Sequence, residues 1–236
     1  MSAYVNQLLF GYYPYVAIAV FLLGSLVRFD REQYSWRSGS SQMLRARQLR
    51  WGSNLFHVGI LAIFAGHFVG LLTPHQLYES FGLTAAAKQM LAIVAGGVFG
   101  LVCLVGLVLL VHRRLVDPRI RRTSSVMDIV VLLMILAQLV LGLITIPYSL
   151  RHPDGAVMLQ LSEWAQHIVT FRAGAADLVA SVDVIYRLHL LLGLTLFVIF
   201  PFSRLVHIWS APVWYVFRPY QVVRRRAVNS RVRLVP

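Results

Sequence analysis

The chain has 236 residues, of which 58% are apolar or aromatic and 13% are charged, and its mean hydropathy is +0.69. This composition excludes an ordinary soluble domain. The net charge of +13 alone is compatible with nucleic-acid binding, but the basic residues gather between and after long apolar runs. We therefore expect a membrane protein, with lipids and no nucleic acid among its partners.

Five apolar runs are each long enough to cross a hydrocarbon core, which needs about 20 residues. In chain order they are about Val5–Val27, Ser53–Leu72, Met90–Val111, Met127–Pro147 and Val184–Ile208. Because a backbone in lipid must satisfy its own hydrogen bonds, each run is predicted to be a helix. The first run lacks a cleavage pattern, so we expect it to be retained, with a kink at Pro14. The sequence thus predicts an all-α, five-helix membrane domain over residues 1–220, followed by a basic tail, 221–236.

Eighteen of the 22 basic residues lie on one side of this topology. They are Arg28, Arg31, Arg37, Arg45, Arg47, Arg50, Arg113, Arg114, Arg119, Arg121, Arg122, Arg204, Arg218, Arg224, Arg225, Arg226, Arg231 and Arg233. The other side holds Lys88, Arg151, Arg172 and Arg187. The positive-inside rule places the N-terminus outside and the C-terminus in the cytoplasm of a multi-pass protein of the cell inner membrane. The run Arg224–Arg226 is expected to contact lipid head groups.

The segments that join the apolar runs are short. Thr73-Pro74 is expected to end the second helix, because the residue before a proline is disfavoured in the α conformation. The longest outer segment, Tyr148–Asp183, is predicted to contain a surface helix at about Met158–Phe171. Cys103 is the only cysteine, which excludes an internal disulfide, a four-cysteine iron–sulfur site and a Cys-x-x-Cys-His attachment. Any redox centre must be held without cysteine, and any catalytic domain belongs to another polypeptide.

Four of the eight histidines lie within or at the ends of apolar helices, namely His57 and His67 in the second and His189 and His207 in the fifth. Ionisable side chains at membrane depth are costly, so they mark functional sites by default. For a single histidine, a hydrogen bond between helices is the alternative. Four on only two helices favour ligation of a cofactor, and paired imidazoles that clamp a haem iron leave no open position for oxygen.

The spacing of these histidines suggests how they pair. His189 and His207 are 18 residues apart, or five full turns and about 27 Å of rise in a continuous helix. His57 and His67 are ten apart, or about 15 Å of rise and about 80° around the helix. Since the two helices are antiparallel, we pair His57 with His207 near the cytoplasm and His67 with His189 toward the outer side. His75 also lies 18 residues after His57, so spacing alone leaves it as an alternative to His67.

Other residues near these histidines have two interpretations each. Arg187 and Arg204 either pair with haem propionates or extend to the membrane interface. Lys88, the only lysine, either hydrogen-bonds a quinone oxygen at the outer start of the third helix or is an ordinary interfacial lysine. Small residues allow close approach of either a macrocycle or a neighbouring helix, and they are Gly59, Gly66, Gly70 and Gly193.

With these residues in view, the chain resembles the gamma subunit of respiratory nitrate reductase, a dihaem cytochrome b that anchors a complex in the membrane. The resemblance covers most of the chain. It is carried by YPYVAIAVFLLGSLVRFD (Tyr13–Asp30), QYSWRSGSSQML (Gln33–Leu44), SNLFHVGILAIFAGHFVGLLTPH (Ser53–His75) and RLHLLLGLTLFVIFPFSRLVHIWSAP (Arg187–Pro212). The segment after Arg151 and the tail after Tyr220 match least.

The resemblance implies two b haems, one held by His57 and His207 on the cytoplasmic side and one held by His67 and His189 on the outer side. It implies that a quinol, menaquinol or ubiquinol, is oxidised near the outer haem beside Lys88. Electrons then pass to an iron–sulfur subunit and a molybdenum-containing catalytic subunit in the cytoplasm, which reduces nitrate. No nitrate-reducing site is expected on this chain.

Two other hypotheses are compatible with the residues. The chain is then either the dihaem cytochrome b anchor of a different cytoplasmic reductase, or a non-redox transporter or scaffold whose histidines bridge helices. The subunits that co-purify distinguish the anchor of a different reductase from a nitrate reductase subunit. A haem spectrum distinguishes either of these from a non-redox transporter or scaffold.

Overall fold

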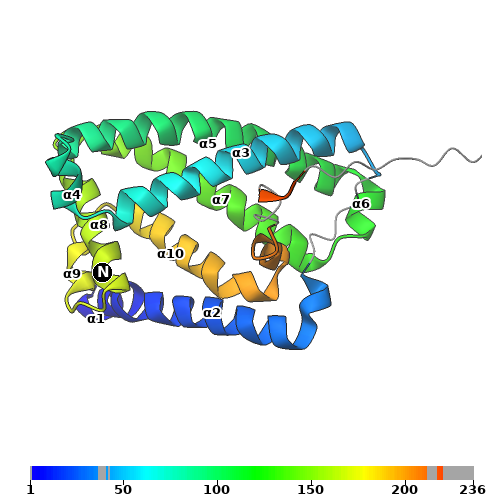
Figure 1. Cartoon of the computed structure of the whole chain (residues 1–236), viewed down its shortest axis with the longest axis horizontal. Coiled ribbons are helices and arrows are strands. Elements are labelled where there is room, and N and C mark those ends of the chain that lie inside the picture. The colour runs from blue at the N-terminus through cyan, green and yellow to red at the C-terminus, as the bar shows by residue number, and fades with distance from the viewer. Residues whose placement is uncertain (1, 37–40, 42, 212–216, 220–236) are drawn as a thin grey trace, which may run out of the picture.

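The computed structural model describes residues 2–36, 41, 43–211 and 217–219, and every regular element in these residues is helical. Five of its helical segments are long and apolar enough to cross a membrane, namely Ala3–Ser35, Ala46–Leu72, Ala85–Val116, Val126–Ser149 and Val184–Phe202. The predicted all-α bundle of five spans is therefore confirmed (Figure 1). The basic tail, 221–236, lies outside the described residues.

The first span is one long segment with a local irregularity before its proline. It consists of α1 (Ala3–Gln7), a π-helical turn η1 (Leu8–Tyr12), α2 (Tyr13–Glu32) and a final 3-10 turn η2 (Gln33–Ser35). Pro14 lies in the first turn of α2, where its missing N–H removes no bond within that helix. The π-helical turn directly precedes the proline, and the predicted kink at Pro14 stays a prediction.

The second and third spans form a closely packed pair. They are α3 (Ala46–Leu72) and α5 (Ala85–Val116), which run side by side through most of their length. An added Cβ on Gly59 would lie 2.5 Å from the Cβ of Cys103, a side chain with no exposed surface. Gly59 therefore permits helix packing, the second of its two predicted roles, and Cys103 is a packing residue.

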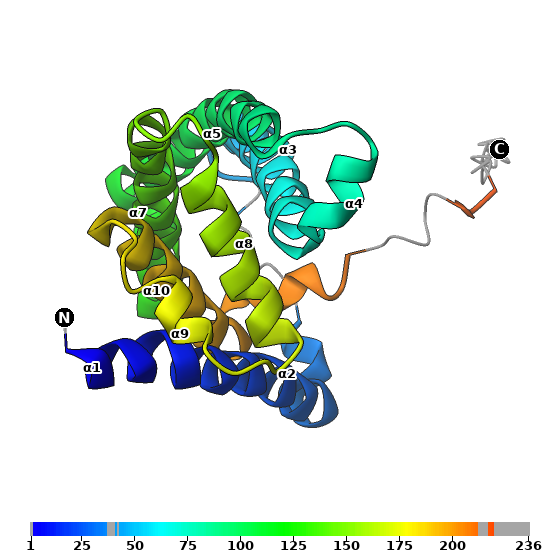
Figure 2. The same cartoon turned by 90° about the vertical axis from the view of Figure 1, so that its left-hand side faces the viewer.

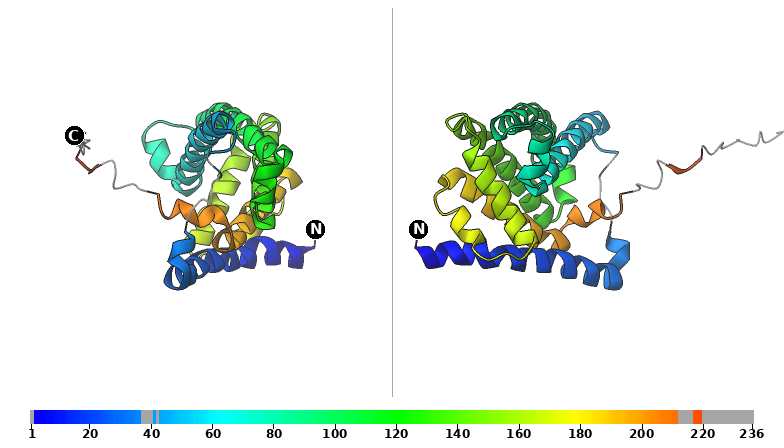
Figure 3. Two further views of the ribbon diagram at one scale, coloured as in Figure 1. Left: turned by 90° about the vertical axis from the view of Figure 1, so that its right-hand side faces the viewer. Right: turned by 60° about the vertical axis from the view of Figure 1, so that its left-hand side comes forward.

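The remaining spans complete the bundle on the other side of this pair. α7 (Val126–Ser149) packs against α5, and α10 (Val184–Ile199) packs against both α7 and α2. The helices thus follow one another across the bundle in the order α3, α5, α7, α10 and α2, and Figure 3 shows α2 along one side and the α3–α5 pair along the other.

Short helices lie at both ends of the bundle. One end, which we call the Lys88 end, carries α4 (His75–Ser80), α8 (Ala156–Val169) and α9 (Ala175–Leu178). The opposite end, which we call the arginine-rich end, carries α6 (Pro118–Arg122). Figure 2 shows α8 running across the Lys88 end. The predicted surface helix is confirmed as α8, whose Trp164 indole donates to the carbonyl of Phe10 at 3.0 Å.

The fifth span departs from the prediction. It does not continue as one helix to Ile208, because α10 ends at Ile199 and is followed by two 3-10 turns, η3 (Phe200–Phe202) and η4 (Arg204–Ile208). Pro201 has no N–H to continue the helix, and the backbone of Ser203 is extended. The expected five-turn alignment of His189 with His207 is therefore wrong.

Candidate functional site

His67 of α3 and His189 of α10 face each other. Their ring centres are 6.2 Å apart, with planes tilted by 41°. Two imidazoles bound to one metal at about 2 Å each have ring centres about 6 Å apart. The separation thus leaves room for one metal atom between the rings. His75 does not take this position, because α3 ends at Leu72 as Thr73-Pro74 predicts and His75 begins α4.

Backbone contacts set the proton on three of the four histidine rings. Nδ1 lies 2.7 Å from the Ser53 carbonyl oxygen in His57, 2.9 Å from that of Ile63 in His67 and 2.6 Å from that of Arg204 in His207. A carbonyl oxygen only accepts, so in the neutral ring Nδ1 carries the proton and Nε2 keeps its lone pair. This is the arrangement that metal-ligating histidines commonly have.

His189 has a different environment. The Gln138 side-chain amide of α7 donates a long hydrogen bond of 3.4 Å to its Nε2, while its buried Nδ1 has no hydrogen-bond partner within the described residues. Gly142, one turn after Gln138, lies against the ring, since an added Cβ there would be 3.0 Å from Cε1 of His189. Neither residue was predicted from the sequence, although a glutamine inside an apolar helix is a signal of the same kind as the histidines.

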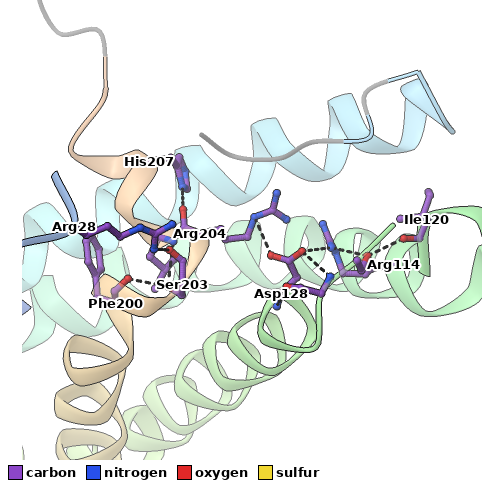
Figure 4. Close-up of polar contacts among 11 residues, drawn as sticks. Arg28, Arg114, Ile120, Asp128, Phe200, Ser203, Arg204 and His207 are labelled. Atoms are coloured by element: carbon purple, nitrogen blue, oxygen red, sulfur yellow. Dashed lines mark hydrogen bonds and ion pairs between the residues drawn. The ribbon is translucent and has the colours of Figure 1, made fainter. Parts of the chain in front are cut away.

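The other predicted pair, His57 and His207 at the arginine-rich end, is not brought into contact. His57 is exposed on α3, and His207 is half-buried on η4. Within the described residues, no ring contact or hydrogen bond joins the two rings. Figure 4 shows the His207 ring extending away from α10, beside a group of arginine side chains. The structure thus brings together only His67 and His189 of the two predicted pairs.

The segment that carries His207 is held by side chains from three helices (Figure 4). Nη1 of Arg28 in α2 donates to the carbonyl oxygens of Pro201, at 2.7 Å, and Ser203, at 2.8 Å. Nε of Arg204 lies 3.6 Å from Asp128 of α7, which also pairs with Arg114 of α5 at 3.4 Å. These contacts fix the turn from which His207 projects, and this role of Arg28 and Asp128 was not predicted from the sequence.

Lys88 is buried, with 8% of its surface exposed, at the start of α5. Its Nζ has no hydrogen-bond partner within the described residues and lies 3.8 Å above the ring of Tyr78. An interfacial lysine that extends into water would be exposed, so this location favours the predicted ligand-binding role. Burial, and secondarily the neighbouring Glu79 carboxylate, raise the pKa of the Tyr78 hydroxyl above its ordinary value.

The donor set suits a haem better than a bare metal ion. The part of the chain that the structure describes has no cluster of three or more His, Cys, Asp or Glu side chains placed to bind a metal. A haem iron takes only two axial ligands from the protein, which a histidine pair supplies. Gly66 and Gly70 face open space, because an added Cβ at either has no neighbour within 4 Å.

A helical membrane protein with paired histidines on two spans is the class that this geometry defines. The family model described as nitrate reductase gamma subunit matches residues 6–226, and the chain belongs to that family. The chain is 53% identical to the respiratory nitrate reductase 1 gamma chain of Escherichia coli (strain K12), over 94% of this chain and 99% of that protein. It is 36% identical to the nitrate reductase gamma chain of Bacillus subtilis (strain 168), over 94% of this chain and 99% of that protein. The predicted resemblance is confirmed.

Proposed function

We propose that this chain oxidises a membrane quinol and carries its electrons through two b-type haems to partner subunits of a respiratory nitrate reductase. The observation that carries the proposal is the pair of facing imidazoles, His67 and His189, at a separation that admits one metal atom. Membership of the nitrate reductase gamma subunit family supports it.

The four histidines hold the two haems in this proposal. His67 and His189 bind the outer haem, and His57 and His207 bind the haem on the cytoplasmic side. A bis-histidine haem supplies one-electron transfer without an open site for oxygen. The backbone carbonyls that accept from Nδ1 of His57, His67 and His207 orient these rings. Arg187, whose buried Nε has no partner within the described residues, and Arg204 are the proposed propionate partners.

Lys88 binds the quinol. Its buried, unpaired ammonium donates to a quinol oxygen and stabilises the negative charge that develops there as the proton leaves. The substrate is a lipid-soluble quinol, such as menaquinol or ubiquinol, because the site lies at one end of the membrane-spanning bundle.

The orientation follows from charge. The arginine-rich end faces the cytoplasm, so the N-terminus and the Lys88 end face outward across the cell inner membrane. Electrons leave at the arginine-rich end to an iron–sulfur subunit and then to a molybdenum-containing catalytic subunit, where nitrate is reduced. Quinol oxidation at the Lys88 end releases protons outside, so the reaction contributes to the transmembrane potential.

Spectroscopy of the purified complex tests the haem assignment. Dithionite-reduced minus oxidised spectra should show low-spin b-type bands equivalent to two haems for each copy of this chain. His67→Ala or His189→Ala should remove one haem, His57→Ala or His207→Ala the other, and the control His167→Ala neither. A colourless chain from haem-replete cells would overturn the proposal, and proton release on the arginine-rich side of sealed vesicles would overturn the orientation.

A further inference from the structure

The short helix α4 places three proton-carrying side chains together at the Lys88 end. Thr73 and Pro74 end α3, and α4 begins at once with His75. Tyr78 and Glu79 follow His75 by three and four residues, so all three side chains lie on the same face of α4. None of them has a role in the function proposed above.

These side chains form a continuous hydrogen-bonded chain. The Tyr78 hydroxyl lies 2.7 Å from Nδ1 of His75, and Nε2 of His75 lies 2.9 Å from Oε1 of Glu79. A carboxylate only accepts, so Nε2 of neutral His75 carries the proton and Nδ1 accepts. The Tyr78 hydroxyl therefore donates to His75, and every donor in the chain points from Tyr78 toward Glu79.

This series of hydrogen-bonded side chains leads from the interior of the protein to its surface. Lys88 and Tyr78 are 8% and 7% exposed, whereas the side chains of His75 and Glu79 are 36% and 50% exposed. Nζ of Lys88 has no hydrogen-bond partner within the described residues and lies 3.8 Å from the centre of the Tyr78 ring, so an oxygen that Lys88 binds on the hydroxyl side of this ring is within reach of the Tyr78 oxygen. The buried end of the chain is thus beside the proposed quinol site.

We propose that Tyr78, His75 and Glu79 conduct to the water outside the proton of the quinol hydroxyl that Lys88 holds, an inference that rests on the proposed function of Lys88. The Tyr78 oxygen accepts the quinol hydroxyl proton as Tyr78 passes its own proton to Nδ1 of His75. His75 passes its Nε2 proton to Glu79, which releases it to water. This transfer leaves His75 with its proton on Nδ1, and exchange with water restores the proton on Nε2. The quinol becomes a quinone when its opposite hydroxyl also loses a proton to water and two electrons leave, one at a time, to the haem that His67 and His189 would hold.

The raised pKa of Tyr78 agrees with this role, because a hydroxyl that stays protonated relays a proton instead of keeping a charge. Burial is the larger cause of the shift and the Glu79 carboxylate the smaller. Tyr78 thus remains a donor to His75 between turnovers.

Stopped-flow reduction of the haems by a soluble quinol, in the purified complex, tests the relay. Tyr78→Phe and His75→Gln should slow quinol-driven reduction by about 100-fold, a magnitude usual for loss of a positioned acid–base group, and should change its solvent deuterium isotope effect. Reduction by dithionite, haem content and the Kd of a non-oxidisable quinone analogue should be unchanged. The control His167→Gln, a half-buried histidine of α8 at the same end, should react at the normal rate.

Lys88→Ala separates failure of the relay from failure of the quinol site. If Lys88→Ala weakens binding of the analogue while Tyr78→Phe and His75→Gln react at the normal rate, the relay is wrong and the quinol site stands. If Lys88→Ala binds the analogue normally, the quinol site itself is wrong. Loss of analogue binding in Tyr78→Phe and His75→Gln would also overturn the relay, because it would indicate a structural role.

Discussion

Arg28 donates a 2.7 Å hydrogen bond to the carbonyl oxygen of Pro201, which is 173 residues further along the chain. The break of the fifth span at Pro201 leaves carbonyl groups without helical partners, and an unsatisfied carbonyl in a bilayer costs several kcal/mol. Arg28 satisfies two of them, those of Pro201 and Ser203. One side chain of the first span thus fixes the turn on which His207 is carried.

We expect Arg28→Gln to loosen this turn and to disturb the haem assigned to His207. Two carbonyls lose their donor, each at about 1–3 kcal/mol, so the melting temperature of the complex in detergent should fall. The midpoint potential or occupancy of the haem proposed for His57 and His207 should change, while the haem proposed for His67 and His189 is retained. Arg31→Gln is the matched control, since Arg31 is exposed one turn further along α2. Equal effects of both substitutions would refute a specific role for Arg28.

Gly142 is expected to control the outer haem. In Gly142→Ala the new Cβ would lie 3.0 Å from Cε1 of His189, so the ring must shift. The spectrum and potential of the haem proposed for His67 and His189 should change, and those of the other proposed haem should not. In Gly97→Ala the nearest atom is Ile146 Cδ1 at an ordinary 3.7 Å, so both haems should keep their potentials. Redox titration followed by optical spectroscopy checks both variants.

The membrane fold was predictable from the sequence because each span is a local property. Hydropathy and length located the five helices, and the conformational restriction before Pro74 located the end of α3. The same rule applied to Pro201 predicts a break in the fifth span, but the apolar run on both sides of that proline favoured one continuous helix. Local periodicity therefore overestimated the length of the last span.

The candidate site was only partly predictable, because its supporting contacts join residues that are distant in sequence. The four histidines were predicted from the cost of polar groups at membrane depth, and Lys88 from its position as the only lysine, at the start of the third helix. Arg28, by contrast, resembles any other arginine at the arginine-rich end of a span until its contact with Pro201 is known. Asp128 is similar, since its sequence context indicates only the helix-capping box with Ser125, which it also forms.

Close packing of α3 against α5 should depend on Gly59. An added Cβ would lie 2.5 Å from the Cβ of Cys103, so Gly59→Ala must separate the two helices, and overpacking of this kind costs about 1–3 kcal/mol. We expect a lower melting temperature in detergent. Gly96→Ala, where an added Cβ has no neighbour within 4 Å, should leave the melting temperature unchanged or slightly raised. If Gly59→Ala melts at the wild-type temperature, the two helices are not packed as closely as described.

The ion pair between Arg45 and Asp117, 2.9 Å long, should make stability depend on pH. Partial burial raises the pKa of Asp117. The backbone N–H groups of Ile120 and Arg119 and the Arg45 guanidinium lower this pKa by more than burial raises it, so the pKa lies below its ordinary value. A carboxylate with a depressed folded-state pKa stabilises the fold above its unfolded pKa of about 3.9, and this stabilisation is lost as the pH falls through the folded-state value. The melting temperature should therefore decline below about pH 4.

Asp117→Asn serves as the comparison for this decline. The variant should melt at a lower temperature than the wild type at pH 7, because its amide keeps a cap oxygen for α6 but loses the charge that attracts Arg45. Below pH 4 the two proteins should converge, since protonation removes the same charge from the wild type. Melting curves recorded in detergent at both pH values test this, and a constant difference between the proteins across the whole range would show that the charge on Asp117 is not what stabilises the turn between α5 and α6.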